Sequence, residues 1–404
     1  MPPAITISRP EGPVKAHIAV PPSKSVANRA LVLADLAGRL SGVAWDGGAD
    51  DTRILRQLLR DKPFRLHCGE GGTTFRFLLA WACVQEGAGH LVTGHARLLQ
   101  RPHEALVEAL RTLGADITVQ ADGLLVRGRR MRGGTVRLHS PASSQYISAL
   151  LLIAARFAEG MELHWTGTRL SRPYVDMTMR LCRRYGAAIS EDGDVIRVVP
   201  GPLQAVPTAV PGDWSAAAFW YQIAALSPGS EIHLAGLEAD GLQGDEAVAT
   251  LLAGNVQGAR AGNGLLLRHS PTAEGAFAAD LTGTPDLFQP LAFTMAGLGR
   301  PAAFTGLDNL PLKETDRLKA VADALAALGC STQYGAGSFH LSGPVANRTP
   351  PPFDPCGDHR MAMSLAPLAL VCGEVALFHP EVVNKSYPGF WRDLAGAGFR
   401  LAYR

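Results

Sequence analysis

Three segments in the first half of the chain place cationic, hydroxyl or glycine residues directly before stretches that are expected to be helical. Residues 21–29 read Pro-Pro-Ser-Lys-Ser-Val-Ala-Asn-Arg, residues 68–76 read Cys-Gly-Glu-Gly-Gly-Thr-Thr-Phe-Arg, and residues 140–145 read Ser-Pro-Ala-Ser-Ser-Gln. The free N–H groups and the dipole of a helix N-terminus favour an anion such as phosphate or carboxylate. Each segment alone is also typical of an ordinary helix cap. Three of them in one chain indicate ligands with more than one anionic group.

The second half of the chain carries carboxylates set among cations. Residues 313–317 read Lys-Glu-Thr-Asp-Arg, and residues 358–361 and 384–388 read Asp-His-Arg-Met and Asn-Lys-Ser-Tyr-Pro. A carboxylate flanked by Lys and Arg can act as a general acid or base whose pKa is set by its neighbours. The same spacing also occurs at solvated helix starts, where charged side chains pair at i,i+3 and i,i+4. Asp213 and Asp286 stand near expected helix starts as well, and capping alone explains Asp213.

The elements that must position these residues recur along the chain. Five expected helices end at a glycine that precedes a short strand, and these glycines lie 68–75 residues apart. They are Gly114, Gly186, Gly254, Gly329 and Gly398. Glycine suits the left-handed position that ends a helix. Six units of about 67 residues fill the chain of 404 residues, which predicts two similar domains of three units each, with a boundary in the Pro/Gly-rich segment 200–212.

Composition excludes several classes of protein. The net charge is +2, 47% of residues are hydrophobic and 18% are charged, which argues against disorder and against a dedicated nucleic-acid binder. No apolar run is long enough for a membrane helix, and the N-terminus lacks the pattern of a signal peptide. The six cysteines show neither CxxC nor zinc spacing. We therefore expect a cytoplasmic protein with reduced thiols and no metal.

Together these motifs resemble, in type and order, those of the 5-enolpyruvylshikimate-3-phosphate (EPSP) synthase family, over nearly the whole chain. Residues 313–318 and 358–361 are the most specific part of the resemblance. It implies an α/β (α+β) fold of two similar domains, each made of three βαβαββ units, known as an inside-out α/β barrel. One domain is expected to hold residues 21–210 and the shikimate 3-phosphate side. The other is expected to hold 1–20 and 211–404, with much of the phosphoenolpyruvate side and the catalytic acids, and the active site is expected in the cleft between them.

The reaction that the resemblance implies belongs to the shikimate pathway, which leads to chorismate and the aromatic amino acids. The enolpyruvyl group of phosphoenolpyruvate passes to the 5-hydroxyl of shikimate 3-phosphate by addition and elimination, and phosphate is released. Both substrates carry phosphate and carboxylate groups, so a site for them needs cations and N–H donors. The resemblance implies no cofactor and no metal. It implies small-molecule substrates as partners, without nucleic acid or membrane, and we expect a monomer that is a target of glyphosate.

The resemblance also implies roles for individual residues. Lys24 is expected to contact both substrates and the departing phosphate, Asp286 to act as base at the 5-hydroxyl, and Glu314 to act as acid and base at the methylene carbon. The residues expected to bind shikimate 3-phosphate are Lys24, Ser25, Arg29, Ser143, Ser144, Gln145, Ser171, Tyr174, Asp286, Asn309 and Lys313. Those expected to bind phosphoenolpyruvate are Lys24, Gly72, Arg101, Gln145, Arg317, Arg360 and Lys385.

Four positions depart from the commonest pattern of this family. Glu70 stands where Asn is usual, Gly71 where Ala is common, Phe77 where Pro is common, and Trp214 where a small residue is usual. A carboxylate beside an anion site repels the ligand, so we expect the Glu70 side chain to be turned outward. These changes bear on the affinity for phosphoenolpyruvate and on the response to glyphosate.

Three other functions fit these residues less well. The sister family, UDP-N-acetylglucosamine enolpyruvyl transferase, usually has Asn after the N-terminal Lys and a loop Cys as acid, whereas here Ser25 follows Lys24 and Cys83 lies in an apolar stretch. A non-catalytic anion-binding relative is expected to lack the acids, yet Asp286 and Glu314 are both present. RNA-end chemistry on a related repeat fold requires a basic face, and the net charge of +2 argues against it.

Overall fold

The computed structural model describes residues 3–45 and 47–404, and the chain divides into two compact units. Residues 24–210 form one, which we call the inserted unit, and residues 1–23 with 211–404 form the other, the terminal unit. Residues 21–23, which we expected in the same domain as 24–210, lie with the terminal unit. The reason is local, because Asp213 N donates to Pro21 O over 2.9 Å and Ser23 N donates to Pro211 O over 2.8 Å.

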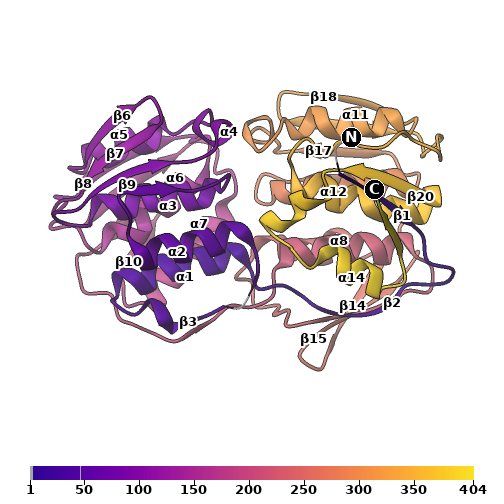
Figure 1. Ribbon diagram of the computed structural model, residues 1–404, viewed down its shortest axis with the longest axis horizontal. Helices are drawn as coiled ribbons and strands as arrows, with labels where there is room; N and C mark the ends of the chain where they lie inside the picture. The colour runs from indigo at the N-terminus through magenta and orange to yellow at the C-terminus, as the bar shows by residue number, and fades with distance from the viewer. Residues whose placement is uncertain (1–2, 46) are drawn as a thin grey trace. The chain divides into compact units, whose positions relative to one another are not determined.

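Helices and strands alternate through the inserted unit (Figure 1). Its helices are α1 (Lys24–Leu36), η1 (Leu40–Gly42), α2 (Asp50–Asp61), α3 (Gly72–Cys83), α4 (Ala96–Leu99), α5 (Glu104–Thr112), α6 (Ser144–Ala154) and α7 (Arg172–Arg184). Its strands are β3 (Val43–Ala44), β4 (Arg65–His67), β5 (Gly89–Thr93), β6 (Asp116–Gln120), β7 (Gly123–Arg127), β8 (Gly134–His139), β9 (Met161–Thr166), β10 (Ile189–Asp192), β11 (Val195–Val198) and β12 (Thr208–Ala209).

The terminal unit repeats the same alternation after the first two strands of the chain. Its strands are β1 (Ala4–Ser8), β2 (Lys15–Ala19), β13 (Glu231–Ala235), β14 (Val256–Ala261), β15 (Gly264–His269), β16 (Phe277–Asp280), β17 (Ala302–Thr305), β18 (Ser331–Gly335), β19 (Ser338–Ser342), β20 (Glu374–Phe378) and β21 (Arg400–Tyr403). Its α-helices are α8 (Trp214–Leu226), α9 (Val248–Leu251), α10 (Phe288–Gly297), α11 (Arg317–Ala327), α12 (His359–Leu365), α13 (Ala369–Cys372) and α14 (Phe390–Gly396). Its 3₁₀ helices are η2 (Gly244–Ala247), η3 (Pro285–Leu287), η4 (Leu310–Leu312), η5 (Ala366–Leu368) and η6 (Pro380–Lys385).

Four sheets within the described residues have the strand order of a complete βαβαββ unit. In the order β4-β5-β7-β6 the first two strands are parallel and the remaining pairs antiparallel, and β8-β9-β11-β10, β2-β13-β15-β14 and β16-β17-β19-β18 repeat this arrangement. The third sheet of each unit has fewer strands: β12 pairs with β3, and β1 lies between β20 and β21. The six-fold period predicted from the glycines is therefore present, with four full copies and two abbreviated ones.

The core of each unit contains three helices that are buried on nearly every side. In the inserted unit α1, α3 and α6 contact one another, and in the terminal unit α8, α10 and α12 do the same. These helices are apolar around most of their circumference, which is typical of helices surrounded by other elements. In α6, for example, all residues from Tyr146 to Ala154 are buried. In each unit these helices lie inside and the sheets lie outside, which is the arrangement that the name inside-out barrel describes.

Parallel strand pairs determine where the predicted site residues lie within each unit. The carboxyl ends of two parallel strands meet at the same edge, and ligands of α/β proteins bind beyond that edge. Most of the predicted site residues lie in the segments that leave those edges: 68–72 and 94–103 after β4 and β5, 140–144 and 167–172 after β8 and β9, 20–24 and 236–247 after β2 and β13, and 281–287 and 306–317 after β16 and β17.

Candidate functional site

Lys24 begins α1 and forms an ion pair inside the inserted unit. Its Nζ lies 2.9 Å from Oδ2 of Asp51, at the start of α2, and the carboxylate is almost completely buried. Thr74 Oγ1 donates to the backbone oxygen of Asp51 over 3.0 Å, which ties α2 to the glycine loop. The ion pair therefore restrains the ammonium group of Lys24. Asp51 was not predicted from the sequence.

Arg29 lies one turn further along α1 and is 2% exposed. Its Nε donates to Thr178 Oγ1 over 2.7 Å, Nη1 to the backbone oxygen of Ser25 over 2.8 Å, and Nη2 to Ser148 Oγ and the backbone oxygen of Tyr174, both over 3.2 Å. Burial lowers the pKa of Arg29 to about 10, so the guanidinium remains charged at neutral pH. The structure thus brings together Ser25, Arg29 and Tyr174, all three predicted to hold the shikimate part.

A side chain at Gly72, the first residue of α3, would meet two guanidinium groups. A Cβ at Gly72 would lie 2.8 Å from Nη1 of Arg101 and 2.9 Å from Nη1 of Arg76, so two guanidinium groups converge on this backbone. Arg76 Nη1 donates to Oε1 of Gln145 over 2.7 Å, and its Nη2 donates to the backbone oxygen of Pro102 over 3.2 Å. Gly72, Arg101 and Gln145, which we predicted as binding residues for phosphoenolpyruvate, therefore lie together.

Arg76 completes this cluster, and we did not assign it a role from the sequence. It is 2% exposed and its Cζ lies 5.4 Å from the ring centroid of Tyr146. The available signal was a single cation inside the otherwise apolar stretch that forms α3. A buried cation costs free energy unless polar groups or an anion compensate it, and such a position is therefore informative.

The predicted phosphate-binding serines lie at the starts of α6 and α7. Ser143 is the N-cap of α6, and its Oγ accepts from Gln145 N over 3.2 Å. Ser144 is buried, and Ser171, the N-cap of α7, has a left-handed φ of 56°. Both helices follow parallel strands, β8 and β9, and they pack against each other. Their N-termini therefore face the same edge, as a shared phosphate site requires.

The carboxylates and cations of the terminal unit form one connected network around Arg317. Its Nε donates to Oδ2 of Asp358 over 2.7 Å, Nη1 to Oδ1 of Asp286 over 2.7 Å, and Nη2 to Oε2 of Glu314 over 3.1 Å. Asp316 caps α11 through the backbone N–H groups of residues 318 and 319. This cap fixes the helix start, so that Glu314 and Arg317 pair at i,i+3.

Three further cations complete the network. Arg360 Nη2 donates to Oδ2 of Asp286 over 3.1 Å, and Lys313 Nζ lies 3.8 Å from Oδ1 of the same residue. Lys385 Nζ lies 2.9 Å from Oε1 of Glu314. Six residues predicted as site residues therefore meet in this unit: Asp286, Lys313, Glu314, Arg317, Arg360 and Lys385.

Asn309, the remaining residue predicted in this unit, lies at the start of η4 and is 4% exposed. Within the described chain its Oδ1 has no hydrogen-bond partner. A buried amide oxygen without a partner is rare in a folded protein, so this atom is available to a ligand donor.

The charges in the network shift the acidity of its members. Burial alone raises the pKa of Asp286, but the attraction of Arg360, Lys313 and Arg317 outweighs it and holds the pKa well below the usual range. For Arg317, burial lowers the pKa, but Asp358, Glu314 and Asp286 outweigh it and hold the pKa above its ordinary value. Asp286 is therefore a carboxylate and Arg317 a cation at any physiological pH.

After Asp51, Asp245 is a second buried carboxylate that we did not predict from the sequence. It lies in η2, is 2% exposed and accepts a hydrogen bond from Ser215 Oγ. Burial, and then the charge of Asp286, raise its pKa to about 6. The usable signal was its place in the segment that follows β13, a strand that pairs in parallel with β2. Asp213 has the structural role that we expected, because its Oδ1 caps α8 through Ser215 N over 3.0 Å.

Comparison with known proteins decides the family. The family model for EPSP synthase (3-phosphoshikimate 1-carboxyvinyltransferase) matches residues 46–394. The chain belongs to this family. A 3-phosphoshikimate 1-carboxyvinyltransferase from Bacteroides fragilis is 39% identical over 397 residues, with 96% of each chain covered. One from Methanoculleus marisnigri is 32% identical over 422 residues, with 96% of this chain and 98% of that protein covered.

Solved structures agree with the family in their fold. EPSP synthase from Acinetobacter baumannii superposes with a TM-score of 0.76 at 23% identity and covers both chains completely. An enolpyruvyl transferase from Streptomyces tendae gives a TM-score of 0.74 at 17% identity, covering 100% of this chain and 99% of the other. The predicted α/β fold of the enolpyruvyl transferase type is confirmed.

The positions that depart from the common EPSP synthase pattern have structural explanations. The Glu70 carboxylate is exposed, and its Oε1 lies 3.6 Å from Nδ1 of His95. A Cβ at Gly71 would lie 2.7 Å from Thr74 Oγ1, so that alanine does not fit without displacing the threonine. The ring of Phe77 packs 5.3 Å from the Arg29 guanidinium. Trp214 is buried and its Nε1 donates to the backbone oxygen of Glu238 over 2.8 Å.

Two further findings concern membrane-spanning helices and the sister family. Among the helices of residues 3–45 and 47–404, none combines the length and the apolar character that crossing a membrane requires. Cys83, the residue considered as a loop acid of the sister family, lies inside α3, and burial raises the pKa of its thiol. A thiol in that position does not match a loop acid, and the sister family is not favoured.

Proposed function

We propose that this protein transfers the enolpyruvyl group of phosphoenolpyruvate to the 5-hydroxyl of shikimate 3-phosphate. The observation that carries the proposal is the Arg317 network, in which two carboxylates, Asp286 and Glu314, are each held between cations. Such an arrangement supplies proton-transfer groups and binding groups for an anionic substrate at one place. Membership of the EPSP synthase family supports the same reaction.

The reaction needs two proton transfers in its first half and two in its second. In the addition, the 5-hydroxyl loses its proton, its oxygen bonds to C2 of phosphoenolpyruvate, and a proton adds to the methylene carbon. In the elimination, that carbon gives a proton back, the C2–O bond to phosphate breaks, and phosphate leaves with a proton. We assign Asp286 to the hydroxyl and Glu314 to the carbon, because each is within reach of cations that stabilise charge on the substrates. Lys24 is assigned to the bridging phosphate oxygen.

Binding groups divide between the two substrates by chemistry. For shikimate 3-phosphate we propose three serine hydroxyls at helix starts for the phosphate, and one buried guanidinium, Arg29, for the carboxylate. The further residues proposed for this substrate are Lys24, Ser25, Gln145, Tyr174, Asp286, Asn309 and Lys313. For phosphoenolpyruvate the proposed residues are Lys24, Gly72, Arg101, Gln145, Arg317, Arg360 and Lys385, and we add Arg76 because its guanidinium joins Arg101 at Gly72.

The low pKa of Asp286 suits a base that is activated by its substrate. Before binding, Arg360, Lys313 and Arg317 stabilise the carboxylate and make it a weak base. A phosphate or carboxylate bound by the same cations competes for their charge, and the pKa of Asp286 rises toward that of an ordinary carboxylate. The base therefore gains strength once the anionic substrates are in place, which limits proton transfer to the complete complex.

We further propose that the enzyme acts as a monomer in the cytoplasm. Its six cysteines are all unpaired and four of them are buried, which is typical of proteins from a reducing compartment. Light scattering on the purified protein tests the oligomeric state.

The experiment that tests the function is a phosphate-release assay with purified protein. We expect release from phosphoenolpyruvate only when shikimate 3-phosphate is present. Glu314→Gln should lower kcat by about two orders of magnitude or more, and Glu381→Gln, an exposed carboxylate of η6 in the same unit, should leave it unchanged. Release with UDP-N-acetylglucosamine instead of shikimate 3-phosphate, or with neither acceptor, would overturn the proposal.

A further inference from the structure

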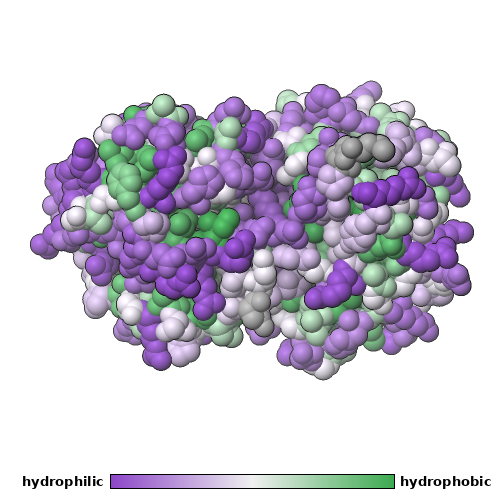
Figure 2. Space-filling model, in the orientation of Figure 1, coloured by the Kyte–Doolittle hydropathy of each residue, from purple (hydrophilic) through white to green (hydrophobic). Residues whose placement is uncertain are grey.

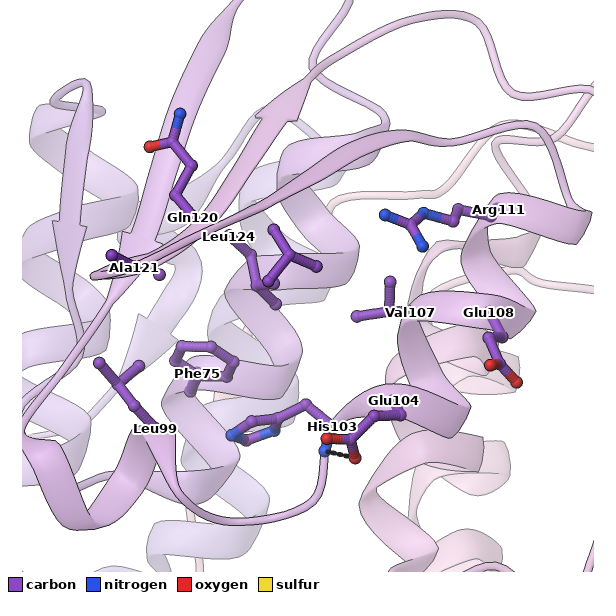
Figure 3. A pocket seen from close by; sticks show the side chains of 12 residues that line it. Phe75, Leu99, His103, Glu104, Val107, Glu108, Arg111, Gln120, Ala121 and Leu124 are labelled. Atoms are coloured by element: carbon purple, nitrogen blue, oxygen red, sulfur yellow. Dashed lines mark hydrogen bonds between the residues drawn. The ribbon is translucent and has the colours of Figure 1, made fainter.

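A cavity of about 290 Å³ lies in the inserted unit between α5 and the hairpin of β6 and β7 (Figure 3). This volume is near the lower end of the range for small-molecule pockets. Phe75 of α3 and Leu99 of α4 line one end, Leu124 of β7 lies opposite, and Val107 faces it from α5. The hairpin carries hydrophobic surface (Figure 2), and Val119 on β6 is 65% exposed.

The inner end of the cavity is lined by two aromatic rings. His103 packs against Phe75 with ring centroids 4.4 Å apart, and its Nε2 lies 2.9 Å from the backbone oxygen of Leu98. Burial, and then the charge of Arg76, lower the pKa of His103 to about 4, so the imidazole is neutral at physiological pH. An apolar group fits against these two rings.

The outer end carries a cation. Figure 3 shows the Arg111 guanidinium turned from α5 toward the cavity. Glu104 and Glu108 of the same helix line the cavity as well. Arg111 is held in place because Nε and Nη2 donate to the backbone oxygen of Ile117 over 3.3 and 2.7 Å. Nη1 makes no hydrogen bond within the described residues. The Glu104 carboxylate accepts from His103 N over 2.9 Å.

The segment that closes the inner end also carries groups of the proposed phosphoenolpyruvate site. His103 follows Arg101 by two residues, and Phe75 immediately precedes Arg76. Between them, the Pro102 backbone oxygen accepts from Arg76 Nη2 over 3.2 Å. A molecule that packs on Phe75 and His103 therefore restrains the same segment from which Arg101 reaches Gly72.

We infer that this cavity binds a small apolar monocarboxylate, with its carboxylate on Arg111 and its apolar body against Phe75 and His103. We also infer that a bound molecule restrains Arg101 and thereby changes the affinity for phosphoenolpyruvate. The second half of the inference rests on the proposed function, since it concerns the affinity for phosphoenolpyruvate. The first half does not. The Arg111 guanidinium offers one charge-assisted hydrogen bond and the rest of the proposed contact is apolar, which suits a single carboxylate. Glu104 and Glu108 also line the cavity and disfavour a second negative charge on the ligand.

The binding test uses 3-phenylpropionate as the probe and calorimetry on the full chain. We expect one molecule to bind per chain, and 3-phenyl-1-propanol, which lacks the carboxylate, to bind about tenfold more weakly. Arg111→Gln should weaken binding of the probe by a similar factor. Arg132→Gln, at an exposed arginine of the same unit that pairs with Glu159 and does not line the cavity, should leave the affinity unchanged. Ala121→Phe, at the exposed hairpin turn that lines the cavity, should abolish binding by filling it.

Several results would overturn the site. Absence of binding to the wild-type protein is one, and equal affinity in wild type, Arg111→Gln and Ala121→Phe is another, because the probe would then lie elsewhere. If Arg111→Gln destabilises the fold through the loss of its bond to Ile117, Arg111→Lys, which keeps the charge, should restore probe binding at least in part. Binding that survives the loss of charge but not Ala121→Phe would overturn the role of the carboxylate.

The coupling test measures kinetics in the presence of the probe. We expect a saturating probe to change the KM for phosphoenolpyruvate by about threefold or more while the KM for shikimate 3-phosphate stays constant, and Ala121→Phe to remove the effect. Binding without any change in KM overturns the coupling. A wild-type protein without activity overturns the proposed function, while the calorimetric result still decides whether the cavity binds the probe.

Discussion

Arg317 donates from Nε to Oδ2 of Asp358 over 2.7 Å, and the two side chains are 2% and 0% exposed. The same carboxylate is the N-cap of α12, because its Oδ1 accepts from Arg360 N over 2.8 Å. One buried aspartate therefore orients two of the arginines that we propose to bind phosphoenolpyruvate. Asp358 is a positioning residue in this arrangement.

Removing Asp358 should destabilise the terminal unit as well as impair the site. We expect Asp358→Ala to lower the free energy of unfolding by about 3–5 kcal/mol, because it leaves Arg317 buried without its closest partner and removes a helix cap. Asp358→Asn, which keeps the cap, should lose less stability and raise the KM for phosphoenolpyruvate. Urea unfolding measures the stability of the two variants, and steady-state kinetics measure the KM. The exposed pair of Asp323 and Lys319 on α11 supplies the control, since Asp323→Ala should change stability little.

The ion pair of Lys24 and Asp51 should matter for turnover more than for folding. Asp51→Asn frees the ammonium group to move, and misplacement of a catalytic group by about 1 Å can cost two orders of magnitude in rate. We therefore expect kcat to fall by about tenfold or more. Asp50 provides a matched control, because it is adjacent, is far more exposed and pairs with Arg53 instead. Equal losses in Asp50→Asn and Asp51→Asn would contradict a specific role for the pair.

Asp245 should make stability depend on pH in a defined direction. Its pKa is about 6 in the folded protein and about 3.9 in an unfolded chain. The folded state therefore holds the proton more tightly, and this stabilising contribution is complete below about pH 4 and lost as the pH rises through 6. Asp245→Asn removes the ionisation. We expect the variant to gain stability relative to wild type on going from pH 4.5 to 7.5, by roughly 1–3 kcal/mol, as measured by urea unfolding at each pH. A constant difference between the two proteins would contradict the shift.

Glu70 should have little influence on phosphoenolpyruvate. Its carboxylate is exposed and lies near His95, so the long side chain keeps the charge in solvent, where it is screened. We expect Glu70→Asn to change the KM for phosphoenolpyruvate by less than about threefold, since exposed charges interact weakly. A fall of about tenfold or more would show that the carboxylate repels the substrate. Glyphosate inhibition measured on both proteins tests the same point with a second anion.

Much of the fold was predictable because its signals are local. Gly114, Gly186, Gly329 and Gly398 have positive φ angles of 104°, 88°, 79° and 95°, as expected of residues that end helices. The exception is Gly254, for which no positive φ occurs: its predicted helix is divided between η2 and α9. There a Cβ would lie 2.6 Å from the Ala273 side chain, so that close approach, rather than backbone conformation, accounts for this glycine.

The site was predictable in part, and the residues that were missed have a common property. Motifs of the family marked the ends of helices, where residues such as Lys24 and Arg317 stand. Asp51, Arg76 and Asp245 act through partners that lie far away in the sequence, for example 69 residues in the contact of Arg76 with Gln145. Spacing along the chain carries no information about such pairs until the sheets are assembled.

The position of β1 has a consequence for synthesis of the protein. This strand is synthesised long before β20 and β21, with which it pairs, and Ile5 lies opposite Tyr403. Similarly, β2 can pair with β13 only after the whole inserted unit has been synthesised, because residues 24–210 lie between these two strands in the sequence. Residues 24–210 can thus fold while both N-terminal strands still lack partners, and contacts over such separations form slowly. A chain interrupted shortly before residue 400 leaves one edge of β1 unpaired, and this edge is open to association with other chains.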